Sequence, residues 1–208
     1  MSGRGLVLGV RCQRGGAVVV AVAEDKTGPR VVLSTFLTTA DERDRGSLEP
    51  YHVAAAMPRL KDGGASAAAK AVVAAGRKRQ QELAVAGLRA IVAALKARQL
   101  VVGEACLLVN RAGWMDDLLA YSLMDPGHPP VAEGLAVREA MREAFKRTRL
   151  PASDIDEKSL PALASQVLAL SPSEIDARMK VLGASAGRPW RKEQKLACLA
   201  AWTRIHAM

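Results

Sequence analysis

The chain has 208 residues, half of them apolar and only 3% aromatic, so residues 1–208 are expected to form a single domain whose core is filled by Val, Leu and Ala. No apolar run approaches the roughly 20 residues of a membrane span, and no signal-peptide pattern is present, which predicts a cytoplasmic protein that does not enter a membrane. The formal net charge of +9 favours an anionic partner such as nucleic acid, and the three scattered cysteines argue against a zinc site or a disulfide framework.

Three short apolar runs at the start of the chain predict three β-strands. They cover residues 6–10, 17–23 and 30–37, and the turn-forming segments QRGG and EDKTGP separate them. Because connections this short join antiparallel neighbours, the three strands should form an antiparallel meander.

Residues 38–100 are expected to form a largely helical connection after the meander. A short helix is predicted at 51–57, and the Ala-rich stretch 65–99 has strong helix formers and no proline. Gly76 and Gly87 either divide this stretch into two helices or mark close contacts with neighbouring elements.

The second half of the chain alternates strands with helices. Residues 105–109 predict a buried strand parallel to the first one, and the segment 150–156 predicts an edge strand. Further helices are expected at 113–124, 131–147, 159–170, 171–183 and 191–205. In the helix at 171–183, Ser173 is the predicted N-cap and Gly183 the predicted C-cap. The last of these is apolar almost all round and should dock deep against the sheet. This order of elements predicts an α/β fold with a mixed five-stranded sheet and helices on both faces.

The order of elements resembles the ribonuclease H-like fold, and the second half is similar to the bacterial Holliday-junction resolvases of that superfamily. The opening LVLGVR stands where those enzymes have a strand ending in Gly, an apolar residue and Asp, and ACLLVN stands where they have a strand ending in Glu. The segments VAEGLAVREAMREAFKRTRLPASDIDEKSL and GRPWRKEQKLACLAAWTRIH are similar to their long Ala-rich helix with the strand after it, and to their acid-bearing last helix.

The resemblance breaks at the residues that carry the family's chemistry. Such enzymes hold two Mg²⁺ ions with carboxylates, and the matching positions here are Arg11 and Asn110, with Lys192 and Lys195 near the acids of the last helix. Cationic side chains repel Mg²⁺, which prefers anionic oxygen ligands. The resemblance therefore implies a scaffold that has lost its metal chemistry and has neither a cofactor nor catalytic residues.

An active Mg²⁺-dependent nuclease with relocated carboxylates stays open as an alternative. Its candidate residues are acids near predicted element ends and one histidine in a rigid loop, namely Asp116, Asp117, Glu133, Glu193 and His128. Each also has a simpler explanation. The acids complement helix N-termini or pair with neighbouring cations on the surface, and the histidine packs within its loop.

Two basic stretches are candidates for nucleic-acid binding. They comprise Lys70, Arg77, Lys78 and Arg79 in one and Arg188, Arg191, Lys192 and Lys195 in the other, with Trp190 as a candidate for stacking on a base. The alternative is that the cations only keep an Ala-rich surface soluble and that Trp190 anchors a loop. The resulting hypothesis is a non-catalytic module that binds nucleic acid or acts as a protein scaffold. A protein-interaction subunit without a nucleic-acid role, and a homodimer, stay open.

Overall fold

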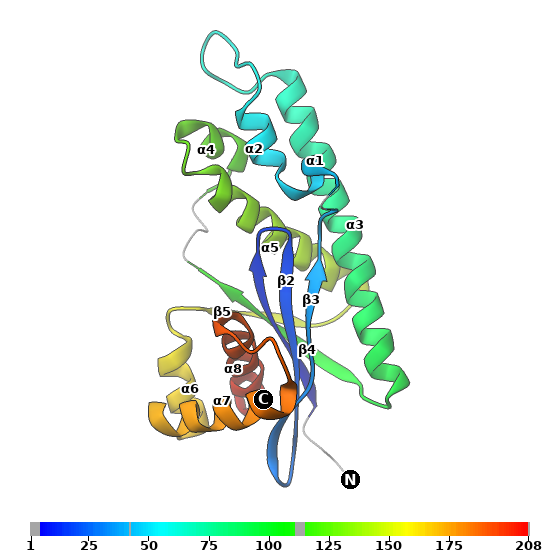
Figure 1. Ribbon diagram of the computed structural model, residues 1–208, viewed down its shortest axis with the longest axis vertical. Helices are drawn as coiled ribbons and strands as arrows, with labels where there is room; N and C mark the ends of the chain where they lie inside the picture. Colours follow the sequence, from blue (N-terminus) through cyan, green and yellow to red (C-terminus); the bar gives the residue numbers. More distant parts are fainter. Residues whose placement is uncertain (1–4, 42, 111–114, 208) are drawn as a thin grey trace.

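The computed structural model describes residues 5–41, 43–110 and 115–207, which form a five-stranded sheet with helices on both faces (Figure 1). In the spatial order β3-β2-β1-β4-β5, the strands are β1 (Leu6–Gln13), β2 (Gly16–Asp25), β3 (Gly28–Thr38), β4 (Val102–Val109) and β5 (Ala152–Asp156). The first three form an antiparallel meander, β4 lies parallel to β1, and β5 lies parallel to β4 at the edge. The predicted mixed sheet is confirmed.

Helices connect the strands and cover both faces of the sheet. They are α1 (Arg45–Leu48), α2 (Pro50–Ala55), α3 (Ala67–Ala97), α4 (Leu118–Met124), α5 (Pro129–Thr148), α6 (Leu160–Leu168), α7 (Pro172–Ala186) and α8 (Lys192–Ala207). Residues of α3 and α5 pack on one face, and residues of α6, α7 and α8 pack on the other. Figure 1 shows α3 reaching well beyond the sheet, where α1 and α2 lie against it. None of the helices in the described ranges is both long and apolar enough to span a membrane.

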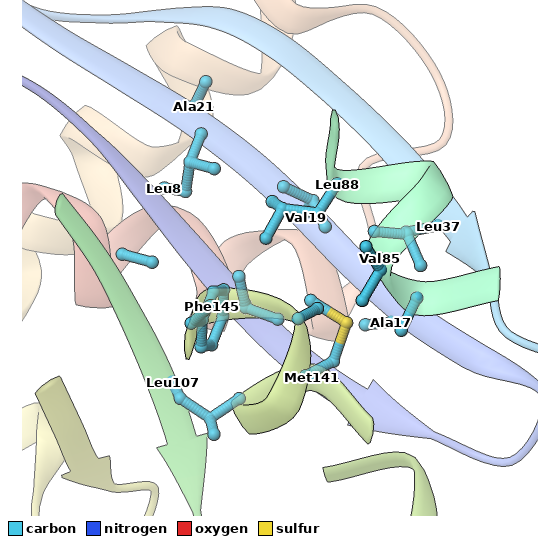
Figure 2. Packing of buried hydrophobic residues seen from close by; sticks show 14 of the residues in the cluster. Leu8, Ala17, Val19, Ala21, Leu37, Val85, Leu88, Leu107, Met141 and Phe145 are labelled. Carbon is cyan, nitrogen blue, oxygen red and sulfur yellow. The ribbon is translucent and has the colours of Figure 1, made fainter. Parts of the chain in front are cut away.

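Alternate residues of the strands supply the two cores, as the period of a β-strand requires. On the α3–α5 side, Leu8 and Val19 of the sheet lie beside Leu88 of α3, and Met141 and Phe145 of α5 close the cluster (Figure 2). On the opposite side the neighbouring residues of the same strands, which include Val7 and Val20, pack against α8. β1 and β2 are therefore buried on both faces.

Helix α8 lies against the sheet more closely than ordinary side chains allow. A Cβ atom at Gly9 of β1 would collide with the carbonyl oxygen of Ala197, so a glycine on the strand opposite an alanine on the helix permits backbone contact. The following helix residues are buried from Ala197 to Thr203, which confirms the expected deep docking of the last helix.

The Ala-rich stretch forms one uninterrupted helix, α3, rather than two. Gly76 and Gly87 lie where other elements contact the helix so closely that a larger side chain would not fit. A Cβ atom at Gly76 would collide with the carbonyl oxygen of Gly46, and one at Gly87 would lie 2.8 Å from Cγ of Leu37. Of the two explanations offered by the sequence, close contact is therefore the correct one.

The predicted caps of α7 were wrong. The N-cap is Ser171, whose hydroxyl accepts from the backbone N–H of Glu174 while the Glu174 carboxylate accepts from the backbone N–H of Ser171. This reciprocal pair needs a Ser-x-x-Glu spacing, which Ser173 does not offer. The C-cap is Gly187, whose φ of 79° suits glycine, and Gly183 lies inside the helix. The predicted helix at 113–124 begins at Leu118, and its first two residues lie outside the described ranges.

Replacing Gly9 by Ala should destabilise the protein by about 3 kcal/mol, because the added methyl group must push α8 away from β1. Gly103 of β4 provides the matched control. A Cβ atom there would have its nearest neighbour, the carbonyl oxygen of Leu6, at 3.8 Å, so Gly103→Ala should change stability by less than about 1 kcal/mol. Urea unfolding of the three proteins checks this, and equal midpoints for wild type and Gly9→Ala would contradict the close contact.

Candidate functional site

The carboxyl ends of β1, β4 and β5 meet at one edge of the sheet. The parallel pairing runs to Arg11 opposite Leu108 and to Val109 opposite Asp156, so the residues that follow these strands come close together. In open α/β sheets this edge is the usual place for ligand binding. The side chains at the ends of these strands therefore define the candidate site.

Arg11, near the end of β1, is held by two carboxylates. Its Nε donates to Oε2 of Glu157 at 2.9 Å and its Nη2 donates to Oε1 of the same residue at 3.1 Å, which makes a bidentate pair. Its Nη1 lies 4.0 Å from Oε1 of Glu193 in the first turn of α8. Arg11 thus joins three elements: β1, the residue after β5, and the start of α8.

On the other side of the sheet, a cleft of about 570 Å³ opens beside the end of β4. We call it the arginine cleft, and it is lined by Arg77, Val109, Asn110, Met115, Asp116, Leu118, Leu135, Arg138, Glu139 and Arg142. Arg77 comes from α3, while Arg138 and Arg142 lie one turn apart on α5. Three guanidinium groups therefore border one concave surface.

The two arginines of α5 differ in their surroundings. Arg142 pairs with Glu139 on its own helix and with Asp154 of β5. Nη2 of Arg138 donates to Oδ1 of Asn110 at 2.8 Å, and its buried Nε has no hydrogen-bond partner within the described part of the chain. Burial lowers the pKa of the Arg138 guanidinium, because loss of solvent disfavours the charged form. An anionic oxygen in the cleft would supply the charge that Asn110 lacks.

Sequence reasoning did not select Arg138, Arg142 or Glu157. The spacing of the two arginines places them on one face of the predicted helix, and this signal was present in the sequence. The same helix carries other exposed cations, including Lys146 and Arg147, so spacing alone does not distinguish them. The distinction comes from the position of the helix over the end of β4.

The acids considered for a relocated nuclease site lie in separate environments. Asp116 lines the arginine cleft, and Asp117 caps α4, its carboxylate accepting from the backbone N–H groups of Leu119 and Ala120. Glu193 lies beside Arg11. Over residues 5–41, 43–110 and 115–207, no three His, Cys, Asp or Glu side chains gather in a way that could hold a metal ion.

Glu133 is completely buried and connects α5 to α2. Its Oε1 accepts from the backbone N–H of Tyr51 at 2.8 Å and from that of His52 at 3.1 Å, which satisfies donors in the first turn of α2. Burial raises the pKa of Glu133 to about 7. The two backbone hydrogen bonds favour the charged form and so lower the pKa, but by less than burial raises it.

His128 makes local contacts at the start of α5. Its ring stacks on that of Tyr121 with centroids 3.9 Å apart, and its Nδ1 lies 2.8 Å from the carbonyl oxygen of the same residue. These contacts agree with local packing in the loop, the simpler of the two explanations considered for this histidine.

The two basic stretches lie on different sides of the sheet. Arg77 lines the arginine cleft, whereas Lys70 borders a hollow next to α4, and Lys78 and Arg79 are exposed on α3. In the second stretch, Arg188 and Arg191 are exposed around the loop before α8. Lys192 and Lys195 line a hollow between α6, α7 and α8.

Trp190 is held in the loop between α7 and α8. Its Nε1 donates to the carbonyl oxygen of Met179 at 3.0 Å, and its ring lies where a Cβ atom at Gly183 would be. The side chain also packs against the core formed with α8. Trp190 therefore has a structural contact of the kind expected for a loop anchor.

Among the solved structures that are similar to this chain, two match it over nearly its whole length. RuvC of Thermus thermophilus gives a TM-score of 0.52 at 12% identity, covering 97% of this chain and 95% of that one. The T. thermophilus RuvC in complex with a Holliday junction substrate gives a TM-score of 0.52 at 12% identity, covering 96% and 92%. No protein-family model matches the sequence, and comparison with curated proteins finds no match. The chain therefore has the ribonuclease H-like fold of these Holliday-junction resolvases, and at this identity the likeness concerns the fold alone.

Glu133→Gln should change how stability depends on pH. The pKa of Glu133 is about 7 in the folded protein and near the ordinary 4.5 in the unfolded chain, so the folded state binds the proton more tightly. The stability that this proton contributes is therefore complete below pH 4.5 and is lost as the pH rises through 7. Glutamine keeps an accepting oxygen and cannot ionise. The variant should match wild type near pH 5 and exceed it by up to about 3 kcal/mol near pH 8.5. Urea unfolding across this range checks the prediction, and parallel pH curves for the two proteins would contradict it.

Proposed function

We propose that this protein binds nucleic acid through the arginine cleft, as a ribonuclease H-like module that does not perform two-metal cleavage. The observation that carries the proposal is the gathering of Arg77, Arg138 and Arg142 around one cleft at the carboxyl ends of the parallel strands. The net charge of +9 supports the same class of partner.

Phosphate groups match the chemistry of this cleft. A guanidinium group offers paired N–H donors that fit two oxygens of a phosphate, and it stays charged when partly desolvated. Arg138 is partly desolvated, and within the described ranges its Nε donor has no partner, so a phosphate oxygen would complete its hydrogen bonding. Arg142, one turn away, pairs with Glu139 and Asp154 and would have to exchange one of these carboxylates for a phosphate in order to bind the same strand.

The non-catalytic part of the proposal rests on Arg11 and Asn110. The residues present at the end of β1 do not fit Mg²⁺, because the Arg11 guanidinium already occupies the space between Glu157 and Glu193. A divalent cation would meet a positive charge there, and its two nearest carboxylates are already engaged. At the end of β4, Asn110 offers an amide oxygen that Arg138 uses.

Removing the two cleft arginines of α5 should weaken DNA binding specifically. In Arg138→Gln/Arg142→Gln, the slope of log affinity against log salt should flatten by up to about 2, roughly one for each phosphate that is no longer neutralised, and affinity at 50 mM salt should fall at least about tenfold. The matched control is Lys146→Gln/Arg147→Gln, which removes the same charge from the last turn of the same helix, outside the lining of the cleft. This control variant should bind DNA about twofold more weakly than wild type. Fluorescence anisotropy with branched and single-stranded DNA measures both. Equal reductions in affinity for the two variants, or no wild-type binding at 50 mM salt, would overturn the proposed interface.

Purified wild-type protein should not cleave a four-way DNA junction, single-stranded DNA or an RNA–DNA hybrid in the presence of Mg²⁺ or Mn²⁺. The reason is the cationic occupant at the end of β1. Gel analysis of labelled substrates tests this. Cleavage that disappears in Asp116→Asn or Glu193→Gln, with the fold intact, would replace the proposal by a nuclease with relocated carboxylates.

A further inference from the structure

An apolar hollow lies on the opposite side of the sheet from the arginine cleft. Its volume is about 390 Å³, within the roughly 300–1,000 Å³ typical of small-molecule sites. We call it the α6–α8 pocket, and it is lined by Pro161, Ser165, Pro172, Ile175, Asp176, Met179, Lys192, Lys195, Leu196 and Leu199. Figure 1 shows the three helices that form it grouped together at the lower left, beside the strands.

The walls of this pocket are held in place by local structure. Pro161 and Pro172 stand in the first turns of α6 and α7, and the reciprocal hydrogen bonds of Ser171 and Glu174 fix the start of α7. Ile175 and Met179 are buried one turn apart and belong to the core. A pocket with such walls is formed before a ligand arrives, so binding requires little ordering of the protein.

One border of the pocket is positively charged. Lys192 and Lys195 lie in the first turn of α8, three residues apart, where the helix dipole adds to their charge. Both side chains are exposed, and neither forms an ion pair with any residue that the structure describes. Asp176 of α7 is the carboxylate of the lining, so the three charged groups leave one net positive charge beside an apolar interior.

We propose that the α6–α8 pocket binds a small amphipathic carboxylate. The apolar body of the ligand would lie against Ile175, Met179 and Leu199, and its carboxylate would lie between the ammonium groups of Lys192 and Lys195. The apolar lining accounts for the first part and charge complementarity for the second. This site is separate from the arginine cleft and does not depend on the proposed nucleic-acid function.

A displacement experiment with the full chain tests the ligand class. The probe is 1-anilinonaphthalene-8-sulfonate, whose fluorescence should rise saturably with one site per chain, and decanoate should displace it. Decanol, which has the same chain length without the charge, should compete at least about tenfold less well. Decanoate that fails to displace the probe, or decanol that competes equally, would overturn the proposal.

Two variants locate the site. Lys192→Gln/Lys195→Gln should raise the Kd for decanoate about tenfold and leave that for decanol unchanged. The matched control, Arg178→Gln/Lys180→Gln, removes two exposed cations of α7 outside the lining and should leave both values unchanged. Ser165→Phe, which fills the pocket, should abolish binding of both compounds while urea unfolding confirms the fold. Undiminished decanoate binding in Ser165→Phe would place the ligand elsewhere and refute this site.

A competition with duplex DNA separates the two proposals. Saturating DNA should leave the decanoate Kd of wild type unchanged, because the arginine cleft and the α6–α8 pocket lie on different sides of the sheet. Loss of decanoate binding in the presence of DNA would show that Lys192 and Lys195 contact phosphates, and would overturn the carboxylate assignment. Failure of DNA binding itself would leave the decanoate titration interpretable.

Discussion

The backbone contact between β1 and α8 determines how the carboxyl edge of the sheet is assembled. Gly9 lets Ala197 lie directly on the central strand. Two residues further along β1, on the same face, is Arg11, and one turn earlier on α8 is Glu193, so the close packing brings these two side chains within reach. Arg11 then binds Glu157 after β5. The small-residue contact sets β1 against α8, and the Arg11 pair then links both to the residue after β5.

Arginine side chains play two different parts on the two sides of this edge. The guanidinium of Arg11 is engaged by carboxylates of its own chain, so it stabilises the arrangement of the elements. Arg138 donates to the amide oxygen of Asn110, and its Nε has no hydrogen-bond partner among the residues that the structure describes, so it is suited to an external anion. The difference lies in the partners that the fold brings to each arginine.

Periodicity, turn chemistry and the order of elements were enough to predict the five strands, the antiparallel meander, the parallel placement of 105–109 beside the first strand and the deep docking of the last helix. They were insufficient where a side chain acts across the fold. Glu133 was considered as a helix-terminal acid, yet it binds backbone donors of α2, far away in sequence. Glu157 could be recognised as the partner of Arg11 only once the structure had placed β5 beside β4, because the two residues are far apart in the sequence. Ser173 was chosen as a cap because local preference for serine does not distinguish it from Ser171 without the geometry of Glu174.

The pairing of β1 with α8 also has a consequence for how the chain folds. The two segments stand almost the whole described length of the chain apart, and the face of the meander that carries Val7, Val18 and Val20 is covered by α6, α7 and α8, which are all synthesised late. A nascent chain would expose this valine-rich surface for most of translation, and long-range closure of this kind is slow. The order of elements that buries this face in the finished molecule therefore leaves it open in the unfinished one, and exposed apolar surface of this kind promotes aggregation.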